Sequence, residues 1–267
     1  MSEQQNRMAN SDRSIVVAVE GAVLRISINR PGARNALDAK SHHALHQAFD
    51  QFHNDPALRV AILTGAGDRA FCAGSDLRDR AATGGDSLPS TGLGGLCQRF
   101  DRCKPLVALV NGDCIGGGLE LVLAADMAVA VPSARFGLPE PRVGLAASGG
   151  LHRLARQIGL KQAMEISLTG RLFDAAEMKG FGVINHVAKD LADAEDKALN
   201  WAQDITKGAP LAVSATKQMI LSGLDHAGLS EAFSADYPAF VTMWDREDAT
   251  EGTRAFLARR DPVWTGK

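Results

Sequence analysis

Two glycine-rich segments, each after a short apolar run, constrain the fold of this chain more than any other feature. The first reads Phe71-Cys72-Ala73-Gly74-Ser75-Asp76-Leu77, and the second runs from Asn111-Gly112 through Gly116-Gly117-Gly118-Leu119-Glu120. Glycines after a strand allow a sharp turn that exposes backbone N–H groups, and in the second segment these groups begin a helix whose dipole adds positive potential. Two such turns facing one point would stabilise negative charge on an oxygen atom. The alternative interpretation is two close-packed strand–helix turns.

The remaining pattern predicts an α/β core followed by a helical region. Hairpin strands are expected at 15–19 and 23–28, a helix at 37–52 and a further helix at 119–125. More strands are expected at 60–64, 106–110, 127–131 and 183–187. From about Leu191 to Arg260 only helical periodicity is present. We therefore expect a disordered tail at 1–14, an α/β core at 15–200 and a helical module at 201–267. That module is predicted to mediate oligomerisation, because it carries Trp201, Phe233, Phe240 and Trp244.

The charge, cysteine content and hydropathy pattern exclude several classes of protein. The 267 residues carry a formal net charge of −2 and one tyrosine, so no basic, aromatic surface for nucleic acid or anionic lipid is expected. The four cysteines form no Cys-x-x-Cys motif and are expected to be reduced. Residues 1–14 lack the apolar run of a signal peptide, and the apolar stretch 115–131 contains two acids. We predict a cytoplasmic protein with no membrane or nucleic-acid partner.

Two glutamates are candidate catalytic acids. Glu120 lies in the otherwise apolar segment Leu119-Glu120-Leu121-Val122-Leu123, and a buried carboxylate is costly unless it is paired, protonated or functional. Its other interpretation is an acid that complements the helix dipole. Glu140 lies between Pro139 and Pro141, which fix much of the local backbone. An exposed turn glutamate is the alternative there.

Four motifs in this order closely resemble the enoyl-CoA hydratase/isomerase (crotonase) family. They are Asn29-Arg30-Pro31 with Arg34-Asn35-Ala36-Leu37, the two glycine-rich segments, and Phe136-Gly137-Leu138-Pro139-Glu140. The end of the chain, 252–260, is similar to the family's C-terminal helix. The resemblance covers residues 15 to 265 approximately.

The resemblance implies a fold, an assembly and a set of site residues. The fold is a spiral of ββα turns with an all-helical C-terminal oligomerisation module, assembled as a homotrimer or as a hexamer of two trimers. The backbone N–H groups of Ser75 and Gly117 form an oxyanion hole for the thioester carbonyl of an acyl-CoA substrate. Substrate binding is implied for Ser75, Asp76, Leu77, Arg78 and Gly117. No metal or redox cofactor is expected, because the thioester itself accepts the electrons.

The same resemblance implies an enoyl-CoA hydratase with two catalytic carboxylates, Glu120 and Glu140. Members with other reactions often lack one of these acids, so both together favour reversible hydration of a 2-enoyl-CoA. An enoyl-CoA isomerase or another acyl-CoA lyase is the alternative. The segment 143–150 lacks a proline that many members carry, and it borders the acyl pocket, so the acyl group itself is left open.

Several rival interpretations can be drawn from other motifs. The segment 65–70 fits a loose G-x-G-x-x-A pattern of nicotinamide-dependent oxidoreductases, but the residues after it are poor helix starters. His42 and His46 could share a metal ion, whereas His53 lies too far along the helix. No Gly-x-Ser-x-Gly motif supports a serine hydrolase. A non-catalytic acyl-CoA-binding protein has no reason to keep a carboxylate in an apolar helix.

One long segment, 81–95, has the composition of a loop. Its sequence, Ala-Ala-Thr-Gly-Gly-Asp-Ser-Leu-Pro-Ser-Thr-Gly-Leu-Gly-Gly, is typical of a lid or of a disordered connection. Because it follows the first glycine-rich turn, we expect it to lie near the site.

Overall fold

The computed structural model describes residues 13–85 and 87–267, in which two β-sheets share one hydrophobic core. The first sheet has the strand order β1-β2-β3-β5-β7-β10, with β1 antiparallel to β2 and all other neighbours parallel. Its strands are β1 (Ile15–Glu20), β2 (Val23–Ile28), β3 (Val60–Gly65), β5 (Leu106–Val110), β7 (Met127–Ala130) and β10 (His186–Val187). Every residue of β3 and β5 is buried, as expected for central parallel strands covered on both faces.

The second sheet is small and built from very short strands in the order β4-β6-β8-β9. These strands are β4 (Ala70–Cys72), β6 (Asp113–Ile115), β8 (Arg135–Gly137) and β9 (Phe173–Asp174). The chain places β3, β5 and β7 in the first sheet and the strands that directly follow them, β4, β6 and β8, in the second. Each pair leads on to a helix, so the predicted spiral of ββα turns is confirmed.

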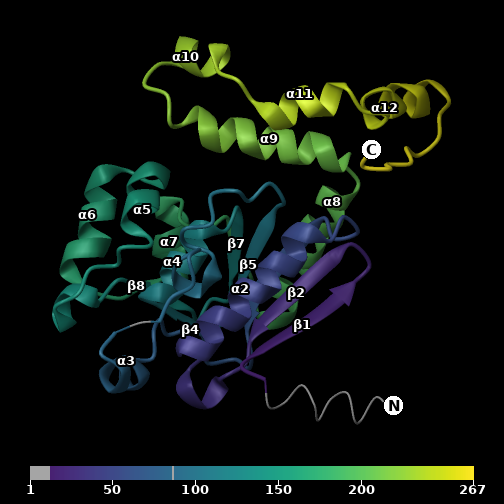
Figure 1. Ribbon diagram of the computed structural model, residues 1–267. Coiled ribbons are helices and arrows are strands. Elements are labelled where there is room, and N and C mark those ends of the chain that lie inside the picture. The colour runs from purple at the N-terminus through teal and green to yellow at the C-terminus, as the bar shows by residue number, and fades with distance from the viewer. Residues whose placement is uncertain (1–12, 86) are drawn as a thin grey trace, which may run out of the picture.

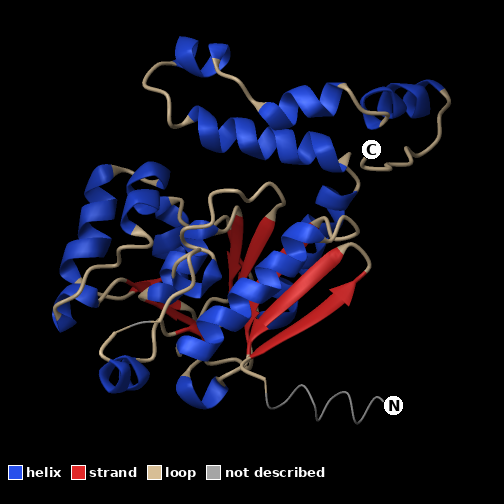
Figure 2. Ribbon diagram, viewed as in Figure 1, coloured by secondary structure: helices blue, strands red, loops and turns tan. Residues whose placement is uncertain are grey.

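Helices cover the sheets on both sides (Figures 1 and 2). They are α2 (Ala39–Asn54), α3 (Leu77–Thr83), α4 (Gly117–Ala124), α5 (Leu151–Gln157), α6 (Leu160–Thr169), α7 (Ala175–Phe181), α8 (Leu191–Thr206), α9 (Pro210–Gly223), α10 (Leu229–Ser234), α11 (Pro238–Trp244) and α12 (Asp248–Leu257). Short 3-10 helices lie at η1 (Pro31–Ala33), η2 (Leu93–Gly95) and η3 (Glu140–Val143). Asp38 begins α2 by accepting a hydrogen bond from Ser41 N–H, and the buried Leu45, Phe49 and Phe52 lie on one face of that helix.

The predicted hairpin, the strands at 60–64, 106–110 and 127–131, and the helices at 37–52 and 119–125 are confirmed within a few residues. The strand expected at 183–187 is wrong over most of its length: only His186 and Val187 pair with β7, and Val183 and Ile184 are buried outside the sheet. The sequence pattern predicts none of the strands of the second sheet. Its strands have two or three residues each, too short to show the alternation that identifies a strand.

Two of the predicted domain boundaries, at residues 14 and 200, can be compared with the structure. The predicted division between residues 200 and 201 falls inside α8, whose Ala194, Ala198 and Ala202 are fully buried and which packs on β3, β5 and β7. The separate C-terminal region therefore begins after Thr206, and Figure 1 shows α9 to α12 as a layer beyond the body. Most of the tail predicted at 1–14 lies outside the described residues.

The segment 81–95 is only partly a loop. Its first residues complete α3, and its last form η2, which packs against α2. Residue 86 lies outside the described part of the chain. Across residues 13–85 and 87–267, no helix has both the length and the apolar character needed to cross a bilayer.

A buried ammonium group links the C-terminal layer to the body. Lys217 of α9 is 7% exposed, and its Nζ donates to Lys104 O at 2.8 Å and to Asp126 Oδ2 at 2.7 Å. The same carboxylate oxygen accepts from Leu106 N–H at the start of β5, at 2.7 Å. Burial lowers the pKa of Lys217 to about 8 despite the attraction of Asp126. Asp126 is thus the carboxylate that compensates this charge.

We expect Asp126→Asn to lower the free energy of unfolding by about 2 kcal/mol or more at pH 7, because it leaves a buried ammonium without its carboxylate. Chemical denaturation followed by circular dichroism measures this. The matched control is Asp204→Asn, which breaks the exposed pair with Lys207 and should cost at most about 1 kcal/mol. Equal effects of the two substitutions would contradict the assignment.

Candidate active site

A cavity of about 430 Å³ lies where the turn after β4, the start of α4 and η3 meet. Five of the predicted site residues line it: Ser75, Leu77, Gly117, Glu120 and Glu140. They come from three separate segments of the chain, which the pairing of β4 with β6 and of β6 with β8 brings side by side. The structure therefore gathers the two glycine-rich turns and both candidate acids at one place.

The two glycine-rich turns touch each other through their backbones. Gly74 has φ of +87°, and a Cβ atom built on it would lie 3.0 Å from Gly117 N and 3.1 Å from Ile115 O. A Cβ built on Gly117 would lie 3.3 Å from Gly74 Cα. Because neither residue has a side chain, the Ser75 and Gly117 peptides can border the same part of the cavity.

The N–H groups of Ser75 and Gly117 have no hydrogen-bond partner within residues 13–85 and 87–267. Their neighbours in the chain are paired: Gly116 N–H donates to Gly137 O at 2.8 Å, and Asp76 N–H donates to Leu37 O at 2.8 Å. Two unpaired donors at the border of one cavity, one of them in the first turn of α4, form a site for an oxygen atom that gains negative charge.

Glu120 lies in the first turn of a helix in which every residue is buried. Its side chain reaches the cavity, and Oε1 accepts a hydrogen bond from Gly149 N–H at 2.8 Å. Burial raises the pKa of Glu120 to about 7; the nearby charge of Glu140 adds to this, while the N–H groups of Gly149 and Gly150 and the Arg153 guanidinium oppose it. A carboxyl group with this pKa can take up or release a proton near neutral pH.

Glu140 is the first residue of η3, after Pro139. Its Oε1 lies so close to Gly116 that a Cβ on that glycine would be 2.6 Å away. Its Oε2 is buried and has no hydrogen-bond partner among the described residues. Burial raises the pKa of Glu140, so both acids lining the cavity hold their protons more tightly than an exposed glutamate.

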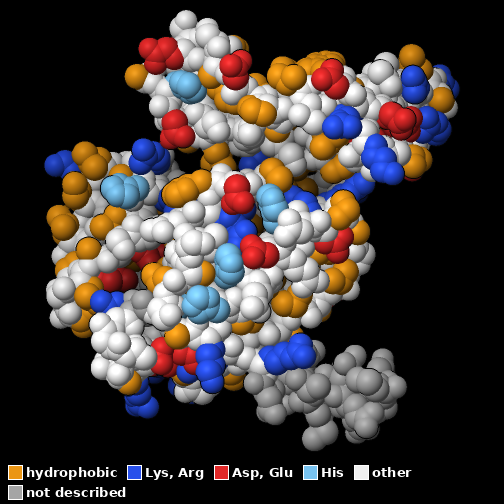
Figure 3. All heavy atoms as spheres, viewed as in Figure 1, with side chains coloured by type: hydrophobic (Ala, Val, Ile, Leu, Met, Phe, Trp, Pro, Cys, Tyr) orange, Lys and Arg blue, Asp and Glu red, His pale blue; other side chains and the backbone are white. Residues whose placement is uncertain are grey.

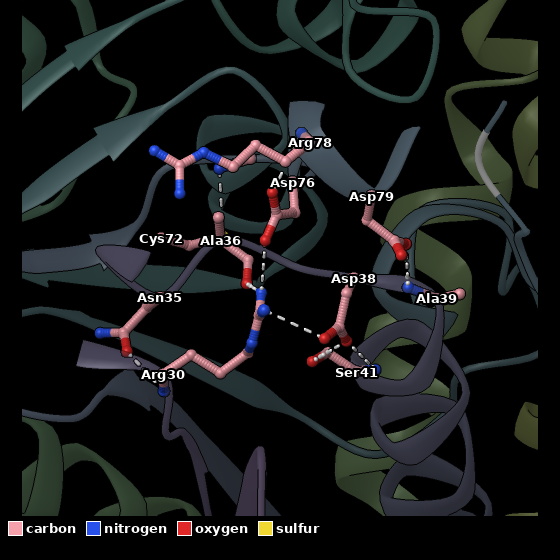
Figure 4. A network of polar contacts seen from close by, with 11 residues as sticks. Arg30, Asn35, Ala36, Asp38, Ala39, Ser41, Cys72, Asp76, Arg78 and Asp79 are labelled. Carbon is pink, nitrogen blue, oxygen red and sulfur yellow. Dashed lines mark hydrogen bonds and ion pairs between the residues drawn. The ribbon is translucent and has the colours of Figure 1, made fainter. Parts of the chain in front are cut away.

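Two residues with an implied role in substrate binding, Asp76 and Arg78, are not among the residues that line the cavity. Asp76 begins α3 by accepting from Arg78 N–H at 3.2 Å, and its Oδ2 pairs with Arg30 Nη1 at 3.1 Å. Figure 4 shows the Asp76 carboxylate pointing toward Arg30, which also pairs with Asp38. Asp76 therefore holds the first glycine-rich turn in place rather than facing the cavity.

The cavity has walls that the sequence motifs did not identify. Leu93 packs on the Gly117 backbone, where a Cβ would lie 2.8 Å from Leu93 Cδ1. Cys97 and the segment 145–149 also line the cavity, and a Cβ built on Gly149 would lie 3.1 Å from Cys97 Cβ. The segment 143–150, which the resemblance placed at the border of the acyl pocket, does line the cavity with residues 143 and 145–149. Leu88 and Leu93 line the cavity, so the segment 81–95 does lie near the site as expected, whereas no sequence signal pointed to Cys97.

The rival motifs take other places in the fold. The glycines of 65–70 lead into strand β4 instead of a helix, which contradicts a dinucleotide-binding turn. His46 Nδ1 is 2.8 Å from Thr91 Oγ1, and His42 Nδ1 accepts from Gly94 N–H at 3.0 Å, so both side chains hold the segment that carries Leu93. In the part of the chain that the structure describes, no three His, Cys, Asp or Glu side chains are grouped to hold a metal ion.

Comparison with known proteins places this chain in one family. A model of the enoyl-CoA hydratase/isomerase family matches residues 18–267. The chain is 40% identical over 256 residues to a mevalonyl-coenzyme A hydratase of Beauveria bassiana, covering 91% of each protein. It is 39% identical to a carnitinyl-CoA dehydratase of Proteus mirabilis, covering 96% of this chain and 99% of the other. The crystal structure of an enoyl-CoA hydratase from Mycobacterium tuberculosis H37Rv superposes with a TM-score of 0.88 at 40% identity, over 95% of this chain and 99% of the other.

The raised pKa of Glu120 implies that the free energy of unfolding depends on pH. The folded pKa, about 7, exceeds the ordinary value of 4.5, so the folded state binds more protons between these values and loses stability as the pH rises through that window. We expect Glu120→Gln to remove this loss, on the order of 3 kcal/mol, and so to raise the melting temperature relative to the wild type more at pH 8 than at pH 5.

Thermal unfolding at both pH values measures the effect. Glu20→Gln serves as a control, because that side chain is half exposed on β1. If the melting temperatures of the wild type and of Glu120→Gln change by the same amount between pH 5 and pH 8, Glu120 does not have a raised pKa.

Proposed function

The chain belongs to the enoyl-CoA hydratase/isomerase (crotonase) family, and we propose that it is an enoyl-CoA hydratase. Its similarity to hydratases and dehydratases over nearly the whole chain indicates a hydro-lyase that acts on acyl-CoA thioesters. The proposed reaction is the reversible addition of water to a 2-enoyl-CoA, giving a 3-hydroxyacyl-CoA.

One observation carries this proposal: two unpaired backbone donors and two carboxyl groups border the same cavity. The donors, Ser75 N–H and Gly117 N–H, suit a thioester carbonyl whose oxygen becomes negative when the enolate forms. Removal of one donor from such a pair costs on the order of 10²–10³ in rate in other enzymes. Polarising that carbonyl makes C3 of the conjugated thioester electrophilic, so water can add there.

The two glutamates account for the protons of this reaction. Water that attacks C3 must lose one proton, and C2 of the enolate must gain one. We assign the first step to Glu120 and the second to Glu140, as the resemblance to the family implies. A carboxyl group with a pKa of about 7, such as Glu120, can exchange a proton near neutral pH. Glu140, whose pKa burial also raises, supplies the proton to C2. The addition leaves Glu120 protonated and Glu140 ionised, and transfer of one proton from Glu120 to Glu140 restores the starting state. The addition changes no oxidation state of the enzyme, so we propose that it requires no metal or redox cofactor.

Both carboxyl groups line the cavity, which favours hydration over the alternative reaction of the family. An isomerase moves one proton between two carbons of the same enolate and needs one acid–base group for this. A binding protein needs neither. The buried Oε2 of Glu140, unpaired among the described residues, has no structural role that would explain its burial.

The residues that line the cavity also limit which acyl groups the substrate can carry. Among the described residues that line it none is aromatic, and Arg80 and Arg142 contribute positive charge. Quaternary ammonium groups are recognised by aromatic faces, which are absent from this lining. We therefore propose acyl groups without a permanent cation, in contrast to the carnitinyl group named for one relative.

The test is hydration of a panel of 2-enoyl-CoAs, followed by loss of the conjugated-thioester absorbance. We expect turnover by the wild type, and a loss of about 100-fold or more in Glu120→Gln and in Glu140→Gln. The double variant should lose less than the product of the two single losses, because the acids act as a unit. Binding of a CoA thioester is measured separately as the control.

Near-normal hydration by either single variant would rule out the two-carboxylate mechanism and favour an isomerase. Binding without any turnover by the wild type would favour a binding protein.

We also propose that the C-terminal helices join copies of this chain into a homotrimer or a hexamer. Large apolar side chains of this region are exposed: Phe233 of α10 by 83%, Trp244 of α11 by 63% and Phe256 of α12 by 81%. Figure 3 shows apolar side chains along this layer. Trp201, which the sequence grouped with them, instead packs against the core. Exposed apolar area of this kind marks an interaction surface.

We expect the double variant Phe233→Glu with Trp244→Glu to lower the mass of the assembly, because two charges would have to be buried in the contact. Light scattering after size-exclusion chromatography measures the mass. Val19→Glu, on the exposed side of β1, is the control and should leave the mass unchanged. A monomeric wild type, or an unchanged mass in the double variant, would contradict the proposal.

A further inference from the structure

We propose that Arg153 is a positioning residue for Glu120, because its guanidinium holds the carbonyl group of Gly149, the residue whose N–H group binds the Glu120 carboxylate. The inference rests on the proposed function, since it assigns a partner to the group that activates water there. Arg153 does not line the cavity and belongs to none of the motifs that identified the site.

The guanidinium joins two walls of the cavity. Arg153 lies on α5, and its Nη1 donates to Cys97 O at 2.6 Å and to Gly149 O at 3.1 Å. Its guanidinium carbon lies 5.6 Å from the centre of the Phe100 ring. Cys97 and Gly149 both line the cavity and are far apart in the sequence, so a single side chain sets the distance between their backbones.

The Gly149 peptide leaves the carboxylate little freedom. Its N–H lies 2.8 Å from Glu120 Oε1, and a Cβ built on Gly149 would lie 3.2 Å from Glu120 Oε2 and 3.1 Å from Cys97 Cβ. A Cβ built on Gly150 would lie 2.9 Å from Glu120 Cγ. Backbone, not side chain, therefore approaches Glu120 from this side, and a shift of the peptide changes the hydrogen bond directly.

The titratable groups that face Glu120 come from three segments of the chain. Glu140 of η3 raises its pKa, Arg153 of α5 lowers it, and Cys97, from the segment before β5, faces it as a thiol. Burial and the charge of Glu120 raise the pKa of that thiol far above its usual value, so it stays neutral. Arg153 is thus the cation that favours the ionised form of Glu120, directly and through Gly149 N–H.

The consequence for hydration has a definite sign. Glu120 must be ionised to accept the proton of water, and losing Arg153 favours the protonated form. The acid limb of the pH profile of kcat/KM should therefore move to higher pH. For a carboxylate and a cation near the protein surface, loss of the cation corresponds to a shift of the carboxyl pKa, and so of the acid limb, by about 0.5–1 pH unit. A purely structural arginine would leave this limb where it is.

The experiment compares Arg153→Met, Arg153→Lys and Arg156→Met in the full-length protein. In Arg153→Met we expect the shifted acid limb and a loss of about 10-fold in kcat at pH 7 that diminishes at higher pH, with KM changed less than about threefold. In Arg153→Lys the charge remains and the limb should stay near that of the wild type. Arg156→Met is the control, because Arg156 is exposed on the same helix and donates only to His152 O.

A second comparison tests whether Arg153 affects the rate by acting on Glu120. In a Glu120→Gln background, Arg153→Met should change the residual rate less than about twofold, because the group it positions is gone. An equal loss in both backgrounds, or an unmoved acid limb in Arg153→Met, overturns the proposal. If Arg153→Met does not fold, Arg153→Gln replaces it in both backgrounds, and an unmoved acid limb or an equal loss in the two backgrounds again overturns the proposal.

Failure of the proposed function would be recognised separately, because the wild type would then hydrate no enoyl-CoA. The titration of the Glu120 carboxyl is in that case followed by infrared difference spectroscopy against Glu120→Gln. Titration at higher pH in the arginine variant supports the positioning role, and an unchanged titration refutes it.

Discussion

The close contact between Gly74 and Gly117 is the constraint on which the site depends. A Cβ on Gly74 would lie 3.0 Å from Gly117 N, so any side chain there would push the two turns apart. The contact requires β4 and β6 to pair, and it requires α4 to start directly behind β4, where a Cβ on Gly118 would lie 2.0 Å from Cys72 O. The three consecutive glycines of the second segment are therefore required by close backbone packing as well as by hydrogen bonding.

Buried amide side chains hold the chain where it crosses between the sheets. Asn111 accepts from Gly65 N–H at 3.0 Å and donates to Gly67 O at 2.7 Å, and Asn35 donates to Ala70 O at 2.7 Å. These bonds satisfy backbone groups that leave the first sheet before the second begins. Arg30 adds ion pairs to Asp38 and Asp76 on the other side of the first turn. The walls of the cavity are thus supported by polar groups that do not line it.

The same burial that builds the core sets the chemistry of the site. Glu120 is 3% exposed in a helix without another polar side chain, and this burial is the largest cause of its raised pKa. The second carboxylate raises it further, whereas Gly149 N–H, Gly150 N–H and Arg153 limit the rise. An acid poised near neutral pH results from these opposing contributions and not from one neighbour.

The sequence by itself determined the parts of this protein that depend on local pattern. The hairpin, the central strands, the glycine-rich turns and Glu120 in its apolar helix follow from residue type and spacing, and the motifs identified the family. The second sheet, the place of α8 in the core and the structural role of Asp76 were decided by tertiary structure, because two-residue strands carry no period and a carboxylate's partner lies elsewhere in the chain. Cys97 lines the cavity, and Arg153 binds Cys97 O, only because distant segments of the chain pack together. Such contacts leave no local signal, since each depends on where a different part of the chain packs.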